Sequence, residues 1–190
     1  SKWLQLYTIQ WLMQKMATII VILLIIVFQP ELRKALEQLG RHSIFSTLLG
    51  SQKGQDIVFL NEIIRSVDEM AERKIGALIV LERSTGLGEF IESGLEIDAL
   101  VREDLLTSIF QKNSPLHDGA VILQGPRIAA ASCLLPLSEI KQLDPKLGTR
   151  HRAAVGLSEL SDALVIIVSE ETGVISIAEN GRLERYLSRQ

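Results

Sequence analysis

The chain has 190 residues, of which 47% are hydrophobic and only 5% aromatic, so it is long enough to bury a core, and that core must be aliphatic. Its formal net charge of −3 argues against a broad nucleic-acid-binding surface, although a local basic cluster could still hold a smaller anion. The single cysteine, Cys133, excludes an intramolecular disulfide and a cysteine-rich zinc module, and it fits a reducing, cytosolic environment for the folded part.

An apolar stretch near the N-terminus differs from the rest of the chain. Residues 16–28 carry no strongly polar side chain except Thr18, and as a helix they would span about 20 Å, less than the roughly 30 Å of a bilayer core. Extended back to Trp3, the helix would reach about 39 Å and would include aromatic residues of the kind found at membrane interfaces. Because the run is apolar on every face, we expect a membrane helix within residues 1–40, with a buried core helix as the alternative.

The region after the apolar stretch connects it to the folded domain. Pro30 opens a second short helix that Gly40 ends, and the basic residues around it suggest that the C-terminal part of the chain faces the cytoplasm. Residues 41–55, in which serine, glycine and glutamine are frequent, are expected to form a linker, and residues 56–190 the folded domain. Since the chain starts at Ser1 and not at a methionine, we expect it to be part of a longer protein.

The folded domain mixes helical and strand patterns. Amphipathic helices are expected from Ile57 to about residue 74, within residues 98–111, and from Gly148 to about residue 161. Apolar or alternating runs predict strands over residues 75–81, 120–124, 127–133, 163–169, 174–178 and 182–187. We therefore predict an α/β fold with a mixed central sheet flanked by helices, preceded by the membrane-type helix.

A polar stretch, Asn-Ser-Pro-Leu-His-Asp-Gly-Ala at residues 113–120, leads directly into one of the expected strands. Asp118 can offer a carboxylate, and Gly119 lets a ligand approach the backbone with no side chain in between. An Asp-Gly pair also makes a simple tight turn into a strand, and on these residues alone that interpretation stays open.

A basic cluster, Gly-Thr-Arg-His-Arg at residues 148–152, opens an expected helix. Thr149 can cap that helix, whose first-turn N–H groups attract anions, and Arg150 and Arg152 add two cations with His151 as a further donor. Arginines two residues apart point in different directions, which suits successive phosphates better than one carboxylate. The alternative is a solvated basic turn.

A third cluster, Ser169, Glu170 and Glu171, lies at the end of a buried strand. A hydroxyl and carboxylates at a strand end can hold metal or phosphate, although such residues also simply solvate turns. Together the three clusters supply acids, cations and glycine access, which are the residue types required for metal-assisted phosphoryl or nucleotidyl transfer. From the residues alone, the sequence predicts a nucleotide-handling site.

Two of these motifs also carry a resemblance to a known family. Leu-His-Asp-Gly-Ala at 116–120 and Gly-Thr-Arg-His-Arg at 148–152 resemble the paired Asp-Gly-Ala and Arg-His-Arg motifs of the diadenylate cyclase domain, over residues 57 to about 180. The preceding apolar helix resembles the membrane-bound CdaA-type members more than the DNA-scanning DisA type. The resemblance implies condensation of two ATP molecules into the second messenger cyclic di-AMP, with release of two pyrophosphates and with Mg²⁺ or Mn²⁺, or Co²⁺ in some members.

The resemblance also implies roles for individual residues. Asp118 would help to activate the ribose 3′-hydroxyl, since a free hydroxyl is a poor nucleophile at neutral pH. The triphosphate would be held by Thr149, Arg150, His151, Arg152 and Ser169. The candidate metal ligands are Asp118, His117 and Glu171, and Glu171 also belongs to the expected nucleotide site. The nucleoside pocket would be lined by Gly119, Ala120 and the backbone around Leu135.

Each protomer would hold one ATP whose 3′-oxygen must reach the α-phosphate of the ATP on another protomer, so the resemblance implies a face-to-face homodimer. It further implies a cell-membrane location with a cytoplasmic catalytic domain, and partners such as a membrane regulator and phosphoglucosamine mutase, but not nucleic acid. Relatives of this type carry several membrane helices, of which only the last is present here.

One residue differs from the pattern of the family, and two alternative functions stay open. Many relatives have an aromatic residue after the cysteine, where this chain has Leu134, so a base-stacking contact is absent. The alternative functions are a non-catalytic, membrane-tethered nucleotide-binding regulatory module and a purely structural α/β domain.

Overall fold

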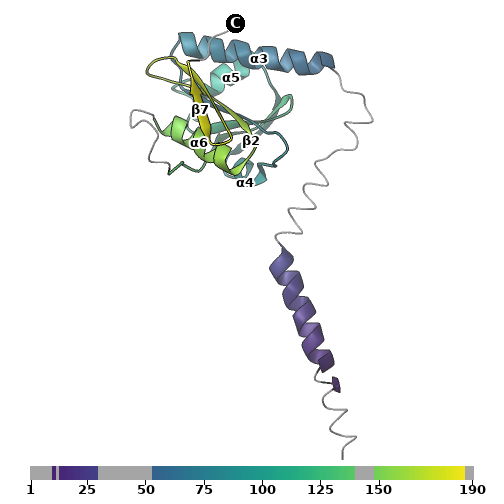
Figure 1. The fold of residues 1–190 in the computed structure, drawn as a ribbon. Coiled ribbons are helices and arrows are strands. Elements are labelled where there is room, and N and C mark those ends of the chain that lie inside the picture. Colours follow the sequence, from purple (N-terminus) through teal and green to yellow (C-terminus); the bar gives the residue numbers. More distant parts are fainter. Residues whose placement is uncertain (1–9, 12, 30–52, 140–147, 187–190) are drawn as a thin grey trace, which may run out of the picture. The chain divides into compact units, whose positions relative to one another are not determined.

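The computed structural model describes residues 10–11, 13–29, 53–139 and 148–186 of a chain that divides into two compact units, Ser1–Ser51 and Gln52–Gln190. In the first unit, residues 13–29 form a helix (Figure 1). All of its side chains are exposed. Within the described residues, no helix is both long enough and apolar enough to cross a membrane. The expected membrane helix is therefore described only in part, and its residues 3–9 and 12, like the short helix expected after Pro30, lie outside the described residues.

A seven-stranded sheet forms the centre of the second unit, with the strand order β2-β4-β3-β1-β5-β6-β7. β1 and β3 are parallel, and every other neighbouring pair is antiparallel, so the predicted mixed sheet is confirmed. The strands are β1 (Ala77–Leu81), β2 (Leu95–Leu100), β3 (Ala120–Gln124), β4 (Arg127–Cys133), β5 (Leu164–Val168), β6 (Ile175–Glu179) and β7 (Arg182–Arg185).

Helices cover both faces of this sheet (Figure 1). On one face, buried side chains of α3 (Lys53–Glu72) and α5 (Glu103–Phe110), including Met70, Leu106 and Phe110, pack against the strands. On the other face, Val155 and Leu157 belong to a second apolar cluster. Burying each large aliphatic side chain contributes about 1.5–3 kcal/mol to folding, so these two clusters fix the layers. The helices are α3 (Lys53–Glu72), α4 (Gly88–Ile91), α5 (Glu103–Phe110) and α6 (Thr149–Leu160).

One strand is absent from the sequence-based prediction. β2 lies at the edge of the sheet, and its side chains alternate between exposed and half-buried, so its hydrophobic pattern is weak. Asp98, with φ 46°, interrupts the pairing of β2 with β4 between Glu96 and Ala99. The sequence pattern places a helix within residues 98–111, and the structure confirms a helix there that begins only at Glu103.

The start of α3 differs from the prediction, whereas its end does not. The helix begins at Lys53, earlier than the first apolar position at Ile57, because residues 53–56 are Lys-Gly-Gln-Asp and give the sequence pattern no apolar position. Its other end lies where expected: Lys74 has φ 54°, and the Ile75 N–H donates to the Met70 carbonyl at 2.8 Å. This is the hydrogen bond that typically closes a helix C-terminus.

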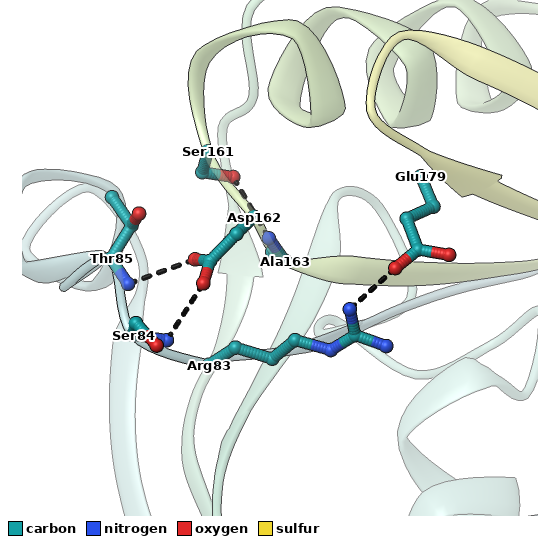
Figure 2. A network of polar contacts seen from close by, with 7 residues as sticks. All are labelled: Arg83, Ser84, Thr85, Ser161, Asp162, Ala163 and Glu179. Atoms are coloured by element: carbon teal, nitrogen blue, oxygen red, sulfur yellow. Dashed lines mark hydrogen bonds and ion pairs between the residues drawn. The ribbon is translucent and has the colours of Figure 1, made fainter.

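A network of polar contacts ties together the sheet end at which β1 finishes and β5 begins (Figure 2). The carboxylate of Asp162 accepts hydrogen bonds from the backbone N–H of Thr85 at 2.8 Å and of Ser84 at 3.1 Å. Beside it, Arg83 and Glu179 form an ion pair at 2.5 Å. These N–H bonds, first of all the one from Thr85, lower the pKa of Asp162 from 3.8 to about 2.

We expect Asp162→Asn to lower the stability of the domain at neutral pH by about 1 kcal/mol, because one amide oxygen cannot accept both N–H groups as the carboxylate does. The depressed pKa means that this contribution is complete above about pH 3.8 and is lost as the pH falls towards about 2. Thermal unfolding of both proteins at pH 7 and pH 2 should therefore show a difference that shrinks in acid. Glu179→Gln is the control, since an exposed ion pair contributes little. A difference that persists unchanged at pH 2 would contradict this assignment.

Candidate functional site

The sequence-predicted residues gather at one end of the sheet, opposite the Asp162 network. β1 and β3 run parallel, so the segments before Ala77 and before Ala120 lie at the same end. β5 runs antiparallel to β1, with Val168 opposite Ala77, and β4 runs antiparallel to β3, with Cys133 opposite Ala120. The residues that follow β4 and β5 therefore join this end too, and the first turn of α6 is bonded to it through Arg150.

The segment before β3 presents Asp118 to solvent. The ring Nδ1 of His117 lies 2.6 Å from the Ser114 carbonyl, and the Ser132 hydroxyl donates to the Leu116 carbonyl at 3.1 Å, so both residues before Asp118 are held in place. Asp118 itself is exposed, and none of the described residues forms a hydrogen bond or ion pair with it. A carboxylate held on a fixed backbone with no internal partner is available to a ligand.

Gly119 and Ala120 have structural reasons for their identities. Gly119 has φ +108°, and a Cβ atom there would lie 2.7 Å from the Ser132 carbonyl carbon and 2.9 Å from the Cys133 carbonyl oxygen. Ala120 is fully buried in the core beneath α6. The glycine therefore allows close packing on β4, and any contact between Ala120 and a ligand would have to come from its backbone.

The first turn of α6 is capped differently from the sequence prediction. Gly148 occupies the N-cap position, with extended φ and ψ, and no side chain caps the helix. Thr149 is the first helical residue, so the proposed cap by Thr149 is wrong, and its side chain is exposed instead. The Gly148 carbonyl accepts the N–H groups of His151 at 3.1 Å and Arg152 at 3.3 Å.

Arg150 joins all three of the predicted clusters. Its guanidinium forms an ion pair with Glu170 at 2.8 Å after β5, and it also donates to the His117 carbonyl at 3.4 Å before β3. Gly76 makes room for this arrangement, because a Cβ atom there would lie 2.9 Å from Arg150 Nη1 and 2.9 Å from Glu170 Cβ. The Arg150 Nε atom is buried without a hydrogen-bond partner among the described residues.

Arg152 has an exposed side chain and holds the segment that follows β4. Its guanidinium donates to the Ser138 carbonyl at 3.1 Å, and the Ser138 N–H donates to the Arg152 carbonyl at 3.0 Å. The same segment passes so close to α6 that a Cβ atom on Gly156 would lie 2.3 Å from the Pro136 carbonyl oxygen. Leu135 is half-buried there, while Leu134 is 71% exposed.

His151 differs in burial from the other two basic residues of its cluster. Its side chain is buried, with only 6% of the residue exposed. Burial, together with the nearby positive charge of Arg185, lowers the pKa of this imidazole below its usual value of 6.5. The structure thus separates His151 from Arg150 and Arg152, with which the sequence motif groups it.

The turn between β5 and β6 contains the last predicted cluster. The Ser169 hydroxyl accepts the Thr172 N–H at 3.4 Å, and the Gly173 N–H donates to the Ser169 carbonyl at 2.8 Å. Glu171 is exposed on this turn. The neighbouring Glu170 was predicted only as a member of this cluster, without a role of its own, and the distant Gly76 and Ser138 were not assigned to the site from the sequence. For Gly76, the available signal was a glycine at the start of an otherwise apolar strand run.

The site has acids that suit a divalent cation but no complete protein cage. Among the described residues, no group of three or more His, Cys, Asp or Glu side chains is placed to hold a metal ion. A carbonyl can only accept, so His117 Nδ1 donates this hydrogen bond, and in the corresponding neutral tautomer Nε2 has the lone pair that a metal ion would use. Mg²⁺ commonly uses one or two carboxylates and substrate phosphates, and an exposed Asp118 fits that kind of binding.

Cys133 offers no competing chemistry at this end of the sheet. Its thiol is buried at the end of β4, and burial raises the pKa of Cys133 to about 11. A thiol with such a pKa stays protonated at neutral pH and is a poor nucleophile.

Comparison with known proteins identifies related chains. Residues 64–183 match the family model described as DisA bacterial checkpoint controller nucleotide-binding. The chain is 50% identical to the cyclic di-AMP synthase CdaA of Bacillus subtilis, over 100% of this chain and 70% of that protein. It is 46% identical to a diadenylate cyclase of Listeria monocytogenes, over 97% of this chain and 68% of that protein.

A solved structure agrees with the fold. The crystal structure of a double mutant of DacA from Staphylococcus aureus is 49% identical and superimposes with a TM-score of 0.71. The match covers 72% of this chain and 91% of the crystallised one.

Proposed function

The chain belongs to the diadenylate cyclase family, and on this basis we propose that it condenses two ATP molecules into cyclic di-AMP with release of two pyrophosphates. The observation that carries the proposal is the position of Arg150, which bonds both to the segment that presents Asp118 and to Glu170 after β5. A carboxylate that can accept a proton from the nucleophile and a guanidinium that can bind phosphates thus lie at one end of the sheet. These are the two requirements of nucleotidyl transfer.

In this proposal, Asp118 accepts the proton of the ribose 3′-hydroxyl as that oxygen attacks. The new bond joins the 3′-oxygen to the α-phosphorus of the other ATP, and the bond from that phosphorus to the bridging oxygen breaks, so that pyrophosphate leaves. Asp118 suits this role because its carboxylate is exposed and has no hydrogen-bond or ion-pair partner among the described residues.

The triphosphate is assigned to the first turn of α6 and to the turn after β5. Arg150 and Arg152 supply positive charge, while the exposed Thr149 and the half-buried Ser169 supply hydroxyl groups. The N-terminal end of α6 adds the partial positive charge of its free N–H groups. His151 is not given a phosphate contact, because its side chain is buried.

A divalent cation fits the same end of the sheet. Asp118 would hold Mg²⁺, Mn²⁺ or Co²⁺ together with phosphate oxygens of the nucleotide, and His117 through Nε2 or Glu171 would be a second protein ligand, because the three side chains do not form one cluster. When bound, the cation would lower the pKa of the 3′-hydroxyl and neutralise charge on the phosphates. The nucleoside is assigned to the surface near Leu135 and to the backbone at Gly119 and Ala120. Leu134, exposed beside it, offers an apolar contact in place of an aromatic stack.

We also propose that catalysis requires two copies of the chain facing each other, with the unit that contains residues 13–29 associated with the membrane. One protomer has a single set of these motifs. If each 3′-oxygen attacks the α-phosphorus of the other ATP, the two ATP sites must be related by a two-fold axis. The exposed and largely apolar helix over residues 13–29 supports the membrane association, and the basic residues that follow it in the sequence support a site on the cytoplasmic side.

The expected result of diluting the full chain in detergent is a loss of specific activity once the concentration falls below the dimer dissociation constant, because mass action then separates the half-sites. The protein is incubated with ATP and Mn²⁺ at a series of concentrations, the cyclic dinucleotide is resolved by chromatography, and the mass of the particle is measured in parallel. Activity that is unchanged on dilution into the monomeric range would refute the dimer. ATP binding without product under any of the three metals would instead favour a non-catalytic nucleotide-binding module.

A further inference from the structure

A group of buried polar atoms lies between the first turn of α6 and strands β6 and β7, and no role has been assigned to it. His151 Nε2, Ser176 Oγ and Arg185 Nε are all buried and have no hydrogen-bond partner among the described residues. Ser176 is 0% exposed. A buried polar group without a partner is destabilising, so three of them in one region require an explanation.

The sheet register shows that these atoms share one face. Ser176 pairs with Arg185 across β6 and β7, and on its other side it pairs with Ile167 of β5. Paired residues in neighbouring strands point to the same face of a sheet. Ile167 and Ala178, two residues along β6 from Ser176, both belong to the apolar cluster that includes the buried residues of α6. Ser176 and Arg185 therefore point towards α6.

His151 meets them from the helix side. It lies in the first turn of α6, and the positive charge of Arg185 acts on its imidazole strongly enough to help lower its pKa. At neutral pH the imidazole is therefore uncharged and has one nitrogen that can accept a hydrogen bond. A cation, a hydroxyl and a neutral imidazole thus lie on the two sides of the contact between α6 and the sheet, and among the described residues no carboxylate forms an ion pair with Arg185.

We propose that the space between His151, Ser176 and Arg185 holds one internal water molecule. In this proposal, Ser176 and Arg185 are positioning residues for the basic turn of α6. One water can accept from Arg185 Nε, donate to His151 Nε2 and exchange a hydrogen bond with the Ser176 hydroxyl. Three bonds to otherwise unpaired groups are the usual environment of a buried water. An apolar guest would leave all three groups unpaired.

The position of His151 links this water to the alignment of Arg150 and Arg152. Arg150 and Arg152 flank His151 in the chain, so the bond that anchors the imidazole also fixes the backbone from which both guanidinium groups extend. Without the water, the turn loses its tie to β6 and β7, and the arginines lose part of their alignment towards phosphate. This step rests on the proposed function, since it assumes that the basic turn binds the triphosphate.

The first test is a high-resolution crystal structure of the full chain. The expected result is density for one water within hydrogen-bond distance of His151 Nε2, Ser176 Oγ and Arg185 Nε. A protein side chain in that space, or direct bonds among the three residues that close it, would overturn the proposal. This readout does not depend on activity, so a water seen in a protein that makes no cyclic dinucleotide would leave the site standing and remove only the proposed function.

The second test measures ATP binding and turnover by Ser176→Ala, with Ser66→Ala as the matched control. Ser66 is equally buried, but its hydroxyl donates to the Ile63 carbonyl of its own helix at 2.8 Å, on the other face of the sheet. Losing one hydrogen bond to the water should raise the KM for ATP about five-fold, with a smaller change in kcat, whereas Ser66→Ala should leave both unchanged.

A second variant protects the conclusion if Ser176→Ala folds poorly. Arg185→Leu removes the donor from the other side of the space and should give the same rise in KM. Equal effects of Ser176→Ala and Ser66→Ala, or a fall in kcat with KM unchanged in both site variants, would contradict a positioning role.

Discussion

Asp118→Asn should lower the rate of cyclic di-AMP formation by about 100-fold or more while leaving the fold and ATP affinity close to those of the original chain. Loss of a positioned base typically costs that much, and loss of a carboxylate also weakens a divalent cation at the same place. The fold should be spared because the carboxylate is exposed and bonds to none of the described residues. The measurements are product formation by chromatography, ATP binding by calorimetry and thermal unfolding.

A matched control for the change of charge is Asp104→Asn. Asp104 is also exposed, but it lies in the first turn of α5, just after Val101. The Val101 N–H bonds to the Pro126 carbonyl in the turn between β3 and β4, which is at the end of the sheet opposite the candidate site. Turnover should be unaffected there. Asp118→Asn with the original rate would remove Asp118 from the chemistry, and Asp118→Asn with a lost thermal transition would show that its role is structural.

Local patterns predicted most of the fold. Runs such as the one at residues 77–81 are apolar on both faces, which is typical of a central strand, and the spacing of apolar residues in α3 and α5 indicates helices that pack on one side. β2 could not be predicted because an edge strand buries little and Asp98 breaks its alternation. The strand order was equally out of reach, since pairing between distant segments leaves no local signal.

The candidate site shows the same division. Motif composition predicted Asp118, Arg150 and Arg152 as site residues, and the structure places them at one end of the sheet, although their roles remain predictions. The orientation of each side chain could not be predicted. His151 lies between two arginines in the sequence, but the 3.6-residue period turns it towards the core while Arg152 faces solvent. The ion pair of Glu170 with Arg150 joins two segments that are distant in the sequence, so only the tertiary structure could show it.

Gly119→Ala should destabilise the domain by about 3 kcal/mol or more, which corresponds to a fall in Tm of about 10 °C or more. Two costs add. An alanine at φ +108° adopts a backbone conformation that side chains rarely allow, and its Cβ would lie within 2.7–2.9 Å of backbone atoms of Ser132 and Cys133. Backbone in the next strand cannot move aside as a flexible side chain could. Thermal unfolding monitored by circular dichroism measures the loss.

Gly125→Ala separates these two costs, because it makes the same substitution at the other end of β3. Gly125 has φ +54°, but a Cβ atom there would meet nothing within 4 Å. It should therefore cost only the conformational strain, about 1 kcal/mol. Similar Tm values for the two variants would show that the contact with β4 is not what requires glycine at 119. A larger loss for Gly119→Ala would assign this glycine to the packing of β3 on β4, and the neighbouring Asp118 would then be placed by the core of the sheet.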